Sequence, residues 1–211
     1  MISKKTDYAI ALLIGFFAGI AAVPTAYAVG VHSAAALLAL PWIGALCIVF
    51  GVWLGGFLSR WLAIFSQLAK FAAVGILNTA IDFAVLNLLS LATGITTGFI
   101  IGGVNIPGFG LALINSYLWN KLWVFQDRRD GEPLFADFLK FFAVSVGSVL
   151  INSGLIILLT TYTPFLGGLV ASRRLNLAKA IATIATLMWN FVGYKLVVFR
   201  KAPTPQPISP R

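Results

Sequence analysis

One apolar stretch of the sequence opens with Lys70-Phe71-Ala72-Ala73-Val74, and a second opens with Lys140-Phe141-Phe142-Ala143-Val144. Each is followed by another apolar segment with a matching end, which reads Lys121-Leu122-Trp123-Val124-Phe125 in the first case and Lys195-Leu196-Val197-Val198-Phe199 in the second. Self-similarity at such a spacing is typical of a duplicated structural unit. The sequence therefore predicts two copies of a two-helix unit, over residues 70–125 and 140–200.

The composition is that of a membrane protein. Of the 211 residues, 60% are hydrophobic and only 10% are charged, far from the balance of a soluble domain. Residues 8–59 and 141–172 contain no charged side chain, and each run exceeds the roughly 20 residues that a spanning helix needs. We therefore predict an all-α, polytopic membrane protein.

Several classes of function are disfavoured. The net charge of +9 does not indicate nucleic-acid binding, because the basic residues stand singly or in pairs beside apolar segments. The single cysteine, Cys47, excludes an intrachain disulfide and a cysteine metal cluster. Phosphate-loop, zinc-protease and nucleophile-elbow motifs are missing, as is the acid-x-acid motif of metal-dependent sugar transferases. We expect no catalytic residue, no metal and no cofactor, and hence not an enzyme.

About six spans are predicted, and they divide the chain into three parts. Residues 1–69 would hold an N-terminal helical hairpin and its connector, residues 70–201 four helices, and residues 202–211, with four prolines, a disordered tail. The predicted spans cover about residues 8–31, 34–58, 70–92, 97–125, 138–160 and 176–199, with the connector at 59–69.

The N-terminal hairpin carries two further signals. Lys4-Lys5, the apolar run and Ala26-Tyr27-Ala28 together resemble a cleavable signal peptide, but the run is long for one, so we expect a retained helix. The motifs Gly15-x-x-x-Gly19 and Gly51-x-x-x-Gly55 are predicted to let the first two helices pack closely.

The lysines and arginines indicate the orientation. With a cytoplasmic N-terminus, six spans place twelve of the 15 basic residues inside the cell and only Arg173, Arg174 and Lys179 outside. Both termini and the charged loop at residues 126–137 are therefore expected on the cytoplasmic side of the inner membrane. The two repeats would then run in the same direction, as parallel repeats.

Asp82 is the only one of the six acidic residues predicted to lie within the membrane. It follows Lys70 by twelve residues, or about 18 Å of helix. A carboxylate at that depth is costly unless it is paired or protonated, so it indicates a substrate, proton or ion site, with a buried structural hydrogen bond as the alternative. Lys179 lies at a similar predicted depth. It either pairs with Asp82 or belongs to an outer basic cluster with Arg173 and Arg174.

Asparagines gather in the four repeat helices, which favours a polar cavity there over isolated interhelical hydrogen bonds. Asn78 shares a helix face with Asp82, and the repeat places Asn152 at the position that corresponds to Asp82. The other amides are Asn115, Asn120 and Asn190. The glycines around Pro107, from Gly102 to Gly110, predict a kink or an unwound turn.

The two repeat endings allow two interpretations. Lys121 and Lys195 either reach the headgroup region as ordinary membrane anchors, or they bind a lipid phosphate beside Asn120 and Tyr194. Four thin helices enclose little volume, so we expect a homo-oligomer, most simply a dimer.

From about Lys70 to Arg200 the sequence resembles the GtrA-like family of small four-helix membrane proteins. The resemblance rests on three motifs: Lys70-Phe71-x-x-Val74-Gly75 with Asn78 and Asp82, Ser116-Tyr117-x-x-Asn120-Lys121-x-Trp123-Val124-Phe125, and Asn190-Phe191-x-x-Tyr194-Lys195-x-Val197-Val198-Phe199.

The resemblance implies a role in glycosylation of cell-surface polysaccharide. It implies a flippase that moves a polyprenyl-phosphate-linked sugar across the cytoplasmic membrane, after a separate glycosyltransferase has charged the lipid. Two alternatives stay open at this point. One is a non-catalytic anchor or partner of a membrane glycosyltransferase, and the other is a small proton-coupled exporter that uses the acid in the membrane.

Overall fold

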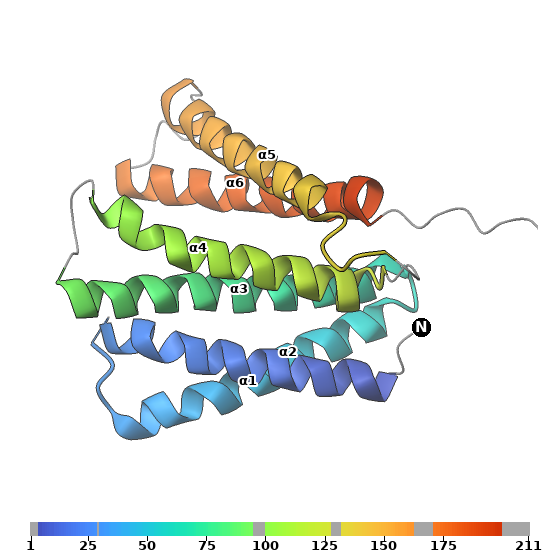
Figure 1. The fold of residues 1–211 in the computed structure, drawn as a ribbon, viewed down its shortest axis with the longest axis horizontal. Helices are drawn as coiled ribbons and strands as arrows, with labels where there is room; N and C mark the ends of the chain where they lie inside the picture. The colour runs from blue at the N-terminus through green and yellow to red at the C-terminus, as the bar shows by residue number, and fades with distance from the viewer. Residues whose placement is uncertain (1–3, 29, 95–99, 128–131, 163–170, 200–211) are drawn as a thin grey trace, which may run out of the picture. The chain divides into compact units, whose positions relative to one another are not determined.

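The computed structural model describes residues 4–28, 30–94, 100–127, 132–162 and 171–199, which form helices and turns and no strand (Figure 1). The α-helices α1, α2 and α3 are each long and apolar enough to cross a membrane. The all-α, polytopic fold is therefore confirmed. In chain order the elements are α1 Lys4–Ala28, α2 Ala34–Leu58, α3 Ile64–Thr93, α4 Ile100–Trp119, the π-helical turn η1 Asn120–Val124, α5 Phe138–Ile157, the π-helical turn η2 Leu158–Tyr162, α6 Ala171–Gly193 and the π-helical turn η4 Tyr194–Val198.

Most helix bounds agree with the predicted spans, and the main differences are two helix starts. α2 has the predicted bounds, but α3 begins at Ile64, so the connector is shorter than the predicted 59–69. Likewise, α6 begins at Ala171 and includes Arg173 and Arg174. Hydropathy marks the apolar part of a helix, whereas the helix itself continues through polar residues as long as its backbone hydrogen bonds continue. The predicted tail at 202–211 lies outside the described residues.

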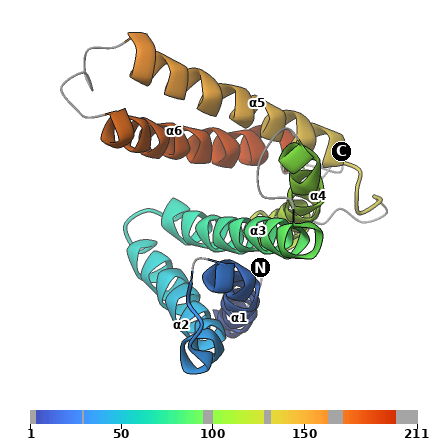
Figure 2. The same cartoon turned by 90° about the vertical axis from the view of Figure 1, so that its left-hand side faces the viewer.

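The chain folds into two compact units, Met1–Gln126 and Asp127–Arg211. In the first unit α1 and α2 contact each other, both contact α3, and α3 packs against α4 (Figure 2). In the second unit α5 packs against α6. The N-terminal hairpin therefore belongs to the same compact unit as the first repeat, while a functional division at residue 69 stays a prediction.

Side chains attach the hairpin to the first repeat near both ends of α1. Asp7 forms an ion pair with Lys70 of α3 at one end. Near the other end the Asn87 amide of α3 donates to the Thr25 hydroxyl, with 3.1 Å between Nδ2 and Oγ1. These two contacts fix the rotation of α1 about its axis relative to α3.

Glycines allow α1 and α2 to approach closely, as predicted for Gly15 and Gly19. A methyl group added to Gly15 would collide with the carbonyl oxygen of Gly44, and one added to Gly19 would collide with that of Leu40. The prediction that Gly51 and Gly55 pack against the first helix is wrong. Gly55 faces Phe65 and Ala69 of α3, and a methyl group at Gly51 would meet nothing within 4 Å. The two motifs therefore serve different interfaces.

Gly15→Ala should destabilise the first unit by about 1–3 kcal/mol, because the added methyl group forces two backbones apart in a packed interface. Gly51→Ala is the matched control, since it adds the same methyl group to open space. Thermal unfolding of the two variants in one detergent measures the difference. Equal unfolding temperatures would show that the α1–α2 contact is looser than described.

α4 and α6 both end in a π-helical turn, at the positions of the two matched sequence endings. The Phe125 amide donates to the Asn120 carbonyl at 2.9 Å, and the Phe199 amide donates to the Tyr194 carbonyl at 2.7 Å. Of the two alternatives predicted around Pro107, the unwound turn is wrong, because α4 is α-helical throughout Ile100–Trp119, and the kink stays a prediction. The irregular backbone lies instead at the end of the helix, and π turns of this kind are frequent at functional sites.

Candidate functional site

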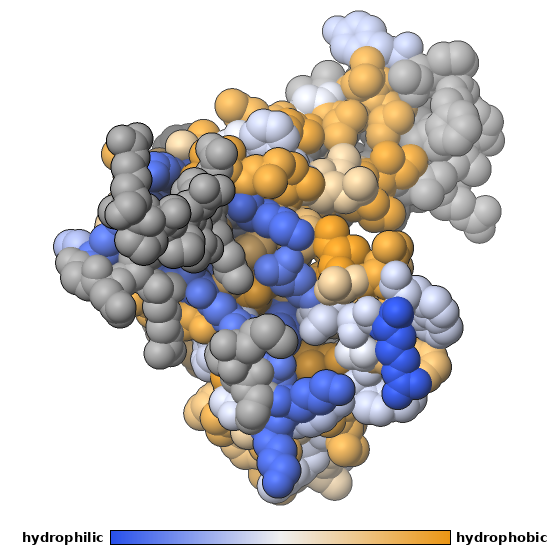
Figure 3. Space-filling model, turned by 90° about the vertical axis from the view of Figure 1, so that its right-hand side faces the viewer, coloured by the Kyte–Doolittle hydropathy of each residue, from blue (hydrophilic) through white to orange (hydrophobic). Residues whose placement is uncertain are grey.

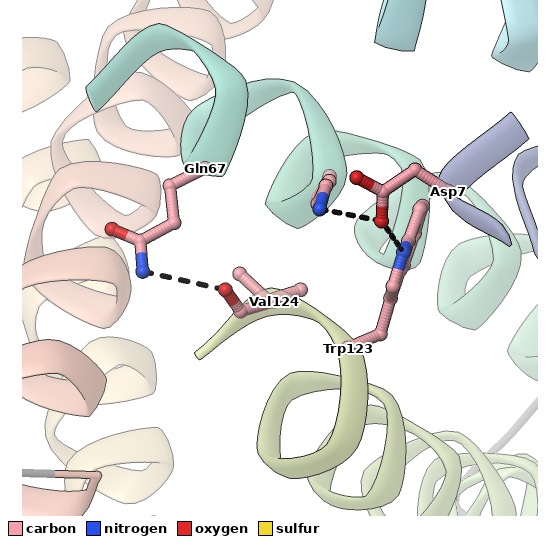
Figure 4. Close-up of polar contacts among 5 residues, drawn as sticks. Asp7, Gln67, Trp123 and Val124 are labelled. Carbon is pink, nitrogen blue, oxygen red and sulfur yellow. Dashed lines mark hydrogen bonds and ion pairs between the residues drawn. The ribbon is translucent and has the colours of Figure 1, made fainter. Parts of the chain in front are cut away.

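An acid–base–indole cluster lies at the end of the first unit where α1 begins. The Lys70 Nζ and Trp123 Nε1 groups both donate to Asp7 Oδ1, at 2.7 Å and 2.9 Å (Figure 4). Lys70 and Trp123 are 6% and 1% exposed, so both donors are almost fully withdrawn from solvent. Beside them the Gln67 amide donates to the Val124 carbonyl at 3.3 Å, which joins α3 to the π turn η1.

Lys121, two residues before Trp123, is buried. Its Nζ donates to the Tyr117 hydroxyl at 3.3 Å and lies 5.7 Å from the centre of the Tyr117 ring. The preceding residue, Asn120, is only 1% exposed, and its Nδ2 donates to the Ser116 carbonyl at 2.8 Å. The Asn120 Oδ1 has no hydrogen-bond donor in the described part of the chain.

Deeper along the same helix pair, Asn78 and Asn115 are brought together as a polar contact. Asn115 Nδ2 of α4 donates to Asn78 Oδ1 of α3 at 2.6 Å. Asn115 also lines a groove of about 390 Å³ between α1, α3 and α4, whose other walls include the apolar side chains of Phe17 and Leu77. A largely apolar groove therefore lies directly beside a pair of hydrogen-bonded amides.

Asp82 faces the backbone of α4 at a glycine. A methyl group on Gly108 would lie 2.9 Å from the Asp82 carbonyl oxygen and 3.0 Å from its Oδ1. Oδ1 is buried and has no hydrogen-bond donor among the described residues. Such an oxygen is costly to leave unpaired, so it is suited to accept a hydrogen bond from a bound group.

These contacts define the α3–α4 seam, the row of polar side chains that runs from Lys70 through Asn78 to Asp82 and faces Trp123, Asn115 and Gly108. Lys70 and Asp82 are twelve residues apart, which corresponds to about 18 Å of helix. The rest of α3 is dominated by apolar side chains. The seam therefore consists of separate polar contacts along an α3–α4 interface that also contains buried apolar side chains such as Val74 and Leu77.

The second unit has a polar contact at the corresponding end of its helix pair. The Tyr194 ring stacks on Phe141 with 4.2 Å between centroids, and its hydroxyl lies 2.8 Å from Ser145 Oγ. One turn away, the Trp189 indole donates to the Val144 carbonyl at 3.0 Å. Aromatic stacking and two hydrogen bonds thus hold α5 to α6 beside the π turn.

The two matched lysines lie in equivalent local geometry. Each is the second residue of its π turn, and each lies over the aromatic ring four residues earlier. The Nζ atom of Lys195 lies 5.6 Å from the centre of the Phe191 ring, close to the 5.7 Å from Lys121 to Tyr117. The exposure differs, because Lys121 is buried and Lys195 is half-buried.

Three other candidate residues lie on the second repeat. Asn190 is half-buried, and its Oδ1 has no hydrogen-bond donor in the ranges that the structure describes. Asn152 and Lys179 lie on α5 and α6, but their side chains are outside the described part of the structure. The pairing of Asp82 with Lys179 and its opposition to Asn152 therefore stay predictions.

Sequence reasoning missed Asp7, Trp123 and Gln67 as parts of the polar cluster. Asp7 precedes the first predicted span, and Trp123 was noted only as part of a matched sequence ending. A signal was nonetheless present, because residues 1–126 contain only two acids, Asp7 and Asp82. A lysine that is buried requires a counter-ion, and Asp7 is the only acid besides Asp82 among residues 1–126.

The fold defines a multi-helix membrane protein in which α3 packs against α4 and α5 packs against α6. Residues 70–199 match the family described as the GtrA/DPMS transmembrane domain, and the chain belongs to this family. The two N-terminal helices lie outside the matched segment.

Two relatives match part of this chain. The uncharacterized membrane protein YngA of Bacillus subtilis is 31% identical over 134 residues, which cover 63% of this chain and 78% of YngA. A dolichol-phosphate mannosyltransferase of Pyrococcus furiosus is 27% identical over 95 residues, which cover 45% of this chain but only 25% of that enzyme. The likeness to the enzyme is thus limited to a quarter of its length.

Proposed function

We propose that this protein flips a polyprenyl-phosphate-linked sugar across the cytoplasmic membrane, for use in cell-surface polysaccharide glycosylation. The observation that carries the proposal is the α3–α4 seam, in which separate polar contacts lie along a mostly apolar helix pair, from the buried Lys70 to Asp82. Polar groups at membrane depth are retained at a cost in stability, and they usually mark the path of a polar substrate. Membership of the GtrA/DPMS family supports a substrate linked to polyprenyl phosphate.

The seam and the groove suit the two halves of such a substrate. Hydroxyl groups of a sugar are matched by the Asn78–Asn115 amides and by the free oxygen of Asp82. An isoprenoid chain is matched by the apolar walls of the neighbouring groove. No step of this process forms or breaks a covalent bond, so we assign the residues binding roles and no catalytic ones.

A second candidate is a non-catalytic membrane partner of a glycosyltransferase. The observation that favours it is the match to part of a dolichol-phosphate mannosyltransferase, because in that relative a segment like this one belongs to a sugar-transferring enzyme. On this alternative the chain would anchor a transferase or present the lipid to it.

Flipping by the purified protein alone separates the two candidates. Proteoliposomes that contain this protein and a fluorescent polyprenyl-phosphate sugar should lose half or more of their inner-leaflet signal to an outside quencher over time, while protein-free liposomes retain it. If flipping occurs only after a glycosyltransferase is added, the partner function holds and the flippase proposal fails.

The proposed orientation places both termini and the 126–137 loop in the cytoplasm, because the basic residues concentrate there. In a background without the native thiol (Cys47→Ser), a cysteine introduced by Asp130→Cys should resist a membrane-impermeant maleimide in intact cells and react after lysis. A cysteine introduced by Gly30→Cys, in the turn between α1 and α2, should react without lysis. The opposite labelling pattern would invert the topology.

We also propose a homo-oligomer, because four thin helices enclose little volume for a lipid-linked sugar. Gly15 and Gly19 are already used inside the chain, so the contact between copies would involve other surfaces. Native mass spectrometry from lipid nanodiscs should show a dimer as the main species. A monomer in nanodiscs and in several mild detergents would contradict this prediction.

A further inference from the structure

Lys70 and Trp123 both belong to the segment that matches the family, and both donate a hydrogen bond to Asp7, which lies outside that segment. Lys70 Nζ and Trp123 Nε1 lie 2.7 Å and 2.9 Å from the same oxygen, Asp7 Oδ1 (Figure 4). The Lys70 Nζ lies 5.6 Å from the centre of the Trp123 ring, so the two donors approach the acid from adjacent directions. Lys70 and Trp123 belong to the segment 70–199 that matches the family, whereas Asp7 does not.

Both groups can only donate hydrogen bonds, and both require an acceptor. Each is less than a tenth exposed, and within the described residues Asp7 is the acceptor for both. Between residues 70 and 126 the only acid is Asp82, about 18 Å of helix away from Lys70. Within residues 70–126, Lys70 and Trp123 thus present a cation and an N–H donor to one position that suits an anion. No acidic residue of the same segment lies near enough to occupy it.

We propose that Lys70 and Trp123 form a binding site for a phosphate group, and that Asp7 fills this site from within the chain until a phosphate-bearing lipid displaces it. The inference rests on the proposed function for the identity of that lipid. An ammonium and an N–H group that share one oxyanion make a charge-assisted pair of hydrogen bonds, the arrangement by which proteins hold phosphates. The site lies at the end of the unit where α1 begins, and hydrophilic side chains gather at this end of the helices (Figure 3).

The environment of Asp7 favours its replacement by a phosphate group over a permanent ion pair with Lys70. Its side chain is 17% exposed, against 7% for the side chain of Lys70. It uses a single oxygen for both donors, and its Oδ2 accepts no hydrogen bond from the part of the chain that the structure describes. Asp7 is also the fourth residue of α1, in the first turn of the helix, where a local opening disturbs few other contacts.

The second repeat provides an internal comparison. Lys140 is the counterpart of Lys70, but its side chain is 57% exposed and its Nζ is paired with Asp137 at 3.3 Å, three residues earlier in the same unit. Val197 stands where the first repeat has Trp123, so the indole donor is missing there. We therefore assign the phosphate site to the first repeat.

The test is a titration of the full chain in neutral detergent with polyprenyl monophosphate. Asp7→Asn removes the competing charge and nearly preserves the shape of the side chain, so it should bind the lipid about tenfold more tightly than the parent protein. Adding Trp123→Phe, which keeps an aromatic ring but removes the N–H donor, should abolish most of this gain. Asp137→Asn is the matched control from the second repeat and should leave the affinity unchanged.

Three results would overturn the proposal. The first is parental affinity in Asp7→Asn, and the second is a gain that survives Trp123→Phe. The third applies if Asp7→Asn is less stable than the parent protein. Inorganic phosphate should then restore its unfolding temperature, and a failure to do so would show that the Asp7–Lys70 ion pair has only a structural role.

A titration with a second lipid, phosphatidylglycerol, shows whether the site prefers the phosphate of the substrate lipid or binds any lipid phosphate. A gain for polyprenyl monophosphate that is absent with phosphatidylglycerol identifies the substrate phosphate as the ligand. An equal gain for both lipids keeps the phosphate site but makes it a general headgroup site. Because none of these titrations requires translocation, a protein that binds as expected but does not flip would refute the proposed function and leave this site intact.

Discussion

Lys70→Met should lower the free energy of unfolding by about 3–5 kcal/mol, the largest effect on stability that we expect from a single substitution outside the glycines. The Lys70 and Asp7 side chains are 7% and 17% exposed, with 2.7 Å between Nζ and Oδ1. Removal of the lysine leaves the Asp7 carboxylate largely buried, with only the Trp123 indole as its donor. Stability is measured by heat or by denaturing detergent, on protein in mild micelles.

Two variants make this prediction specific. Lys140→Met removes the corresponding lysine of the second repeat, which is 57% exposed, and should change stability by no more than about 1 kcal/mol. The double variant with Asp7→Leu and Lys70→Met removes both charges and should recover most of the loss, because a buried ion pair is far less costly to delete than to break. If Lys70→Met and Lys140→Met are equally stable, the ion pair of the first unit is not buried in the folded protein.

Asp82→Asn should slow flipping by about 10- to 100-fold while leaving substrate binding close to the parental value. The amide keeps the size of the side chain and one acceptor oxygen, but it removes the charged or protonated carboxyl that we place in the substrate path. A hydrogen bond to a charged group is worth about 1.5–3 kcal/mol, which corresponds to this range of rates. Proteoliposome flipping and a binding titration on the same preparations measure the two quantities.

Thr79→Val is the matched control for Asp82. Thr79 lies on the same helix three residues earlier, but it is exposed and its hydroxyl donates to the Gly75 carbonyl of its own helix at 2.9 Å. Its replacement should leave flipping unchanged. Lys179→Met should add little to Asp82→Asn if the two residues act in one network. Parental flipping by Asp82→Asn would reduce Asp82 to a packing residue beside Gly108.

The overall fold was largely predictable because it depends on patterns that repeat along the chain. Long uncharged runs are sufficient to predict membrane helices, and α2 has the predicted bounds. The start at Ala171 was missed because α6 begins with polar and basic residues, and the start at Ile64 was missed because residues 59–69 were predicted to form a connector. The unwound turn near Pro107 was wrong because a membrane helix can retain its α-helical backbone through glycine and proline.

The site was less predictable because its contacts join residues that are distant in sequence. Asn78 and Asn115 were both chosen as candidates, but their direct hydrogen bond depends on the rotation of two helices that hydropathy does not set. The link between Asp7 and Trp123 spans 116 positions of the sequence. In the sequence, Asp7 is an acid near the N-terminus and Trp123 is an aromatic residue at the end of a predicted span. Only tertiary packing brings the two side chains into contact.

The paired π turns bear on the history of the chain. A π turn holds one residue more than an α turn in each hydrogen-bonded loop, so it is the trace that a single-residue insertion leaves in a helix. η1 and η4 occupy the same place in the two repeats, and both have lysine as their second residue. One insertion in an ancestral half-length gene, followed by duplication, explains both turns, whereas the reverse order requires the same insertion twice.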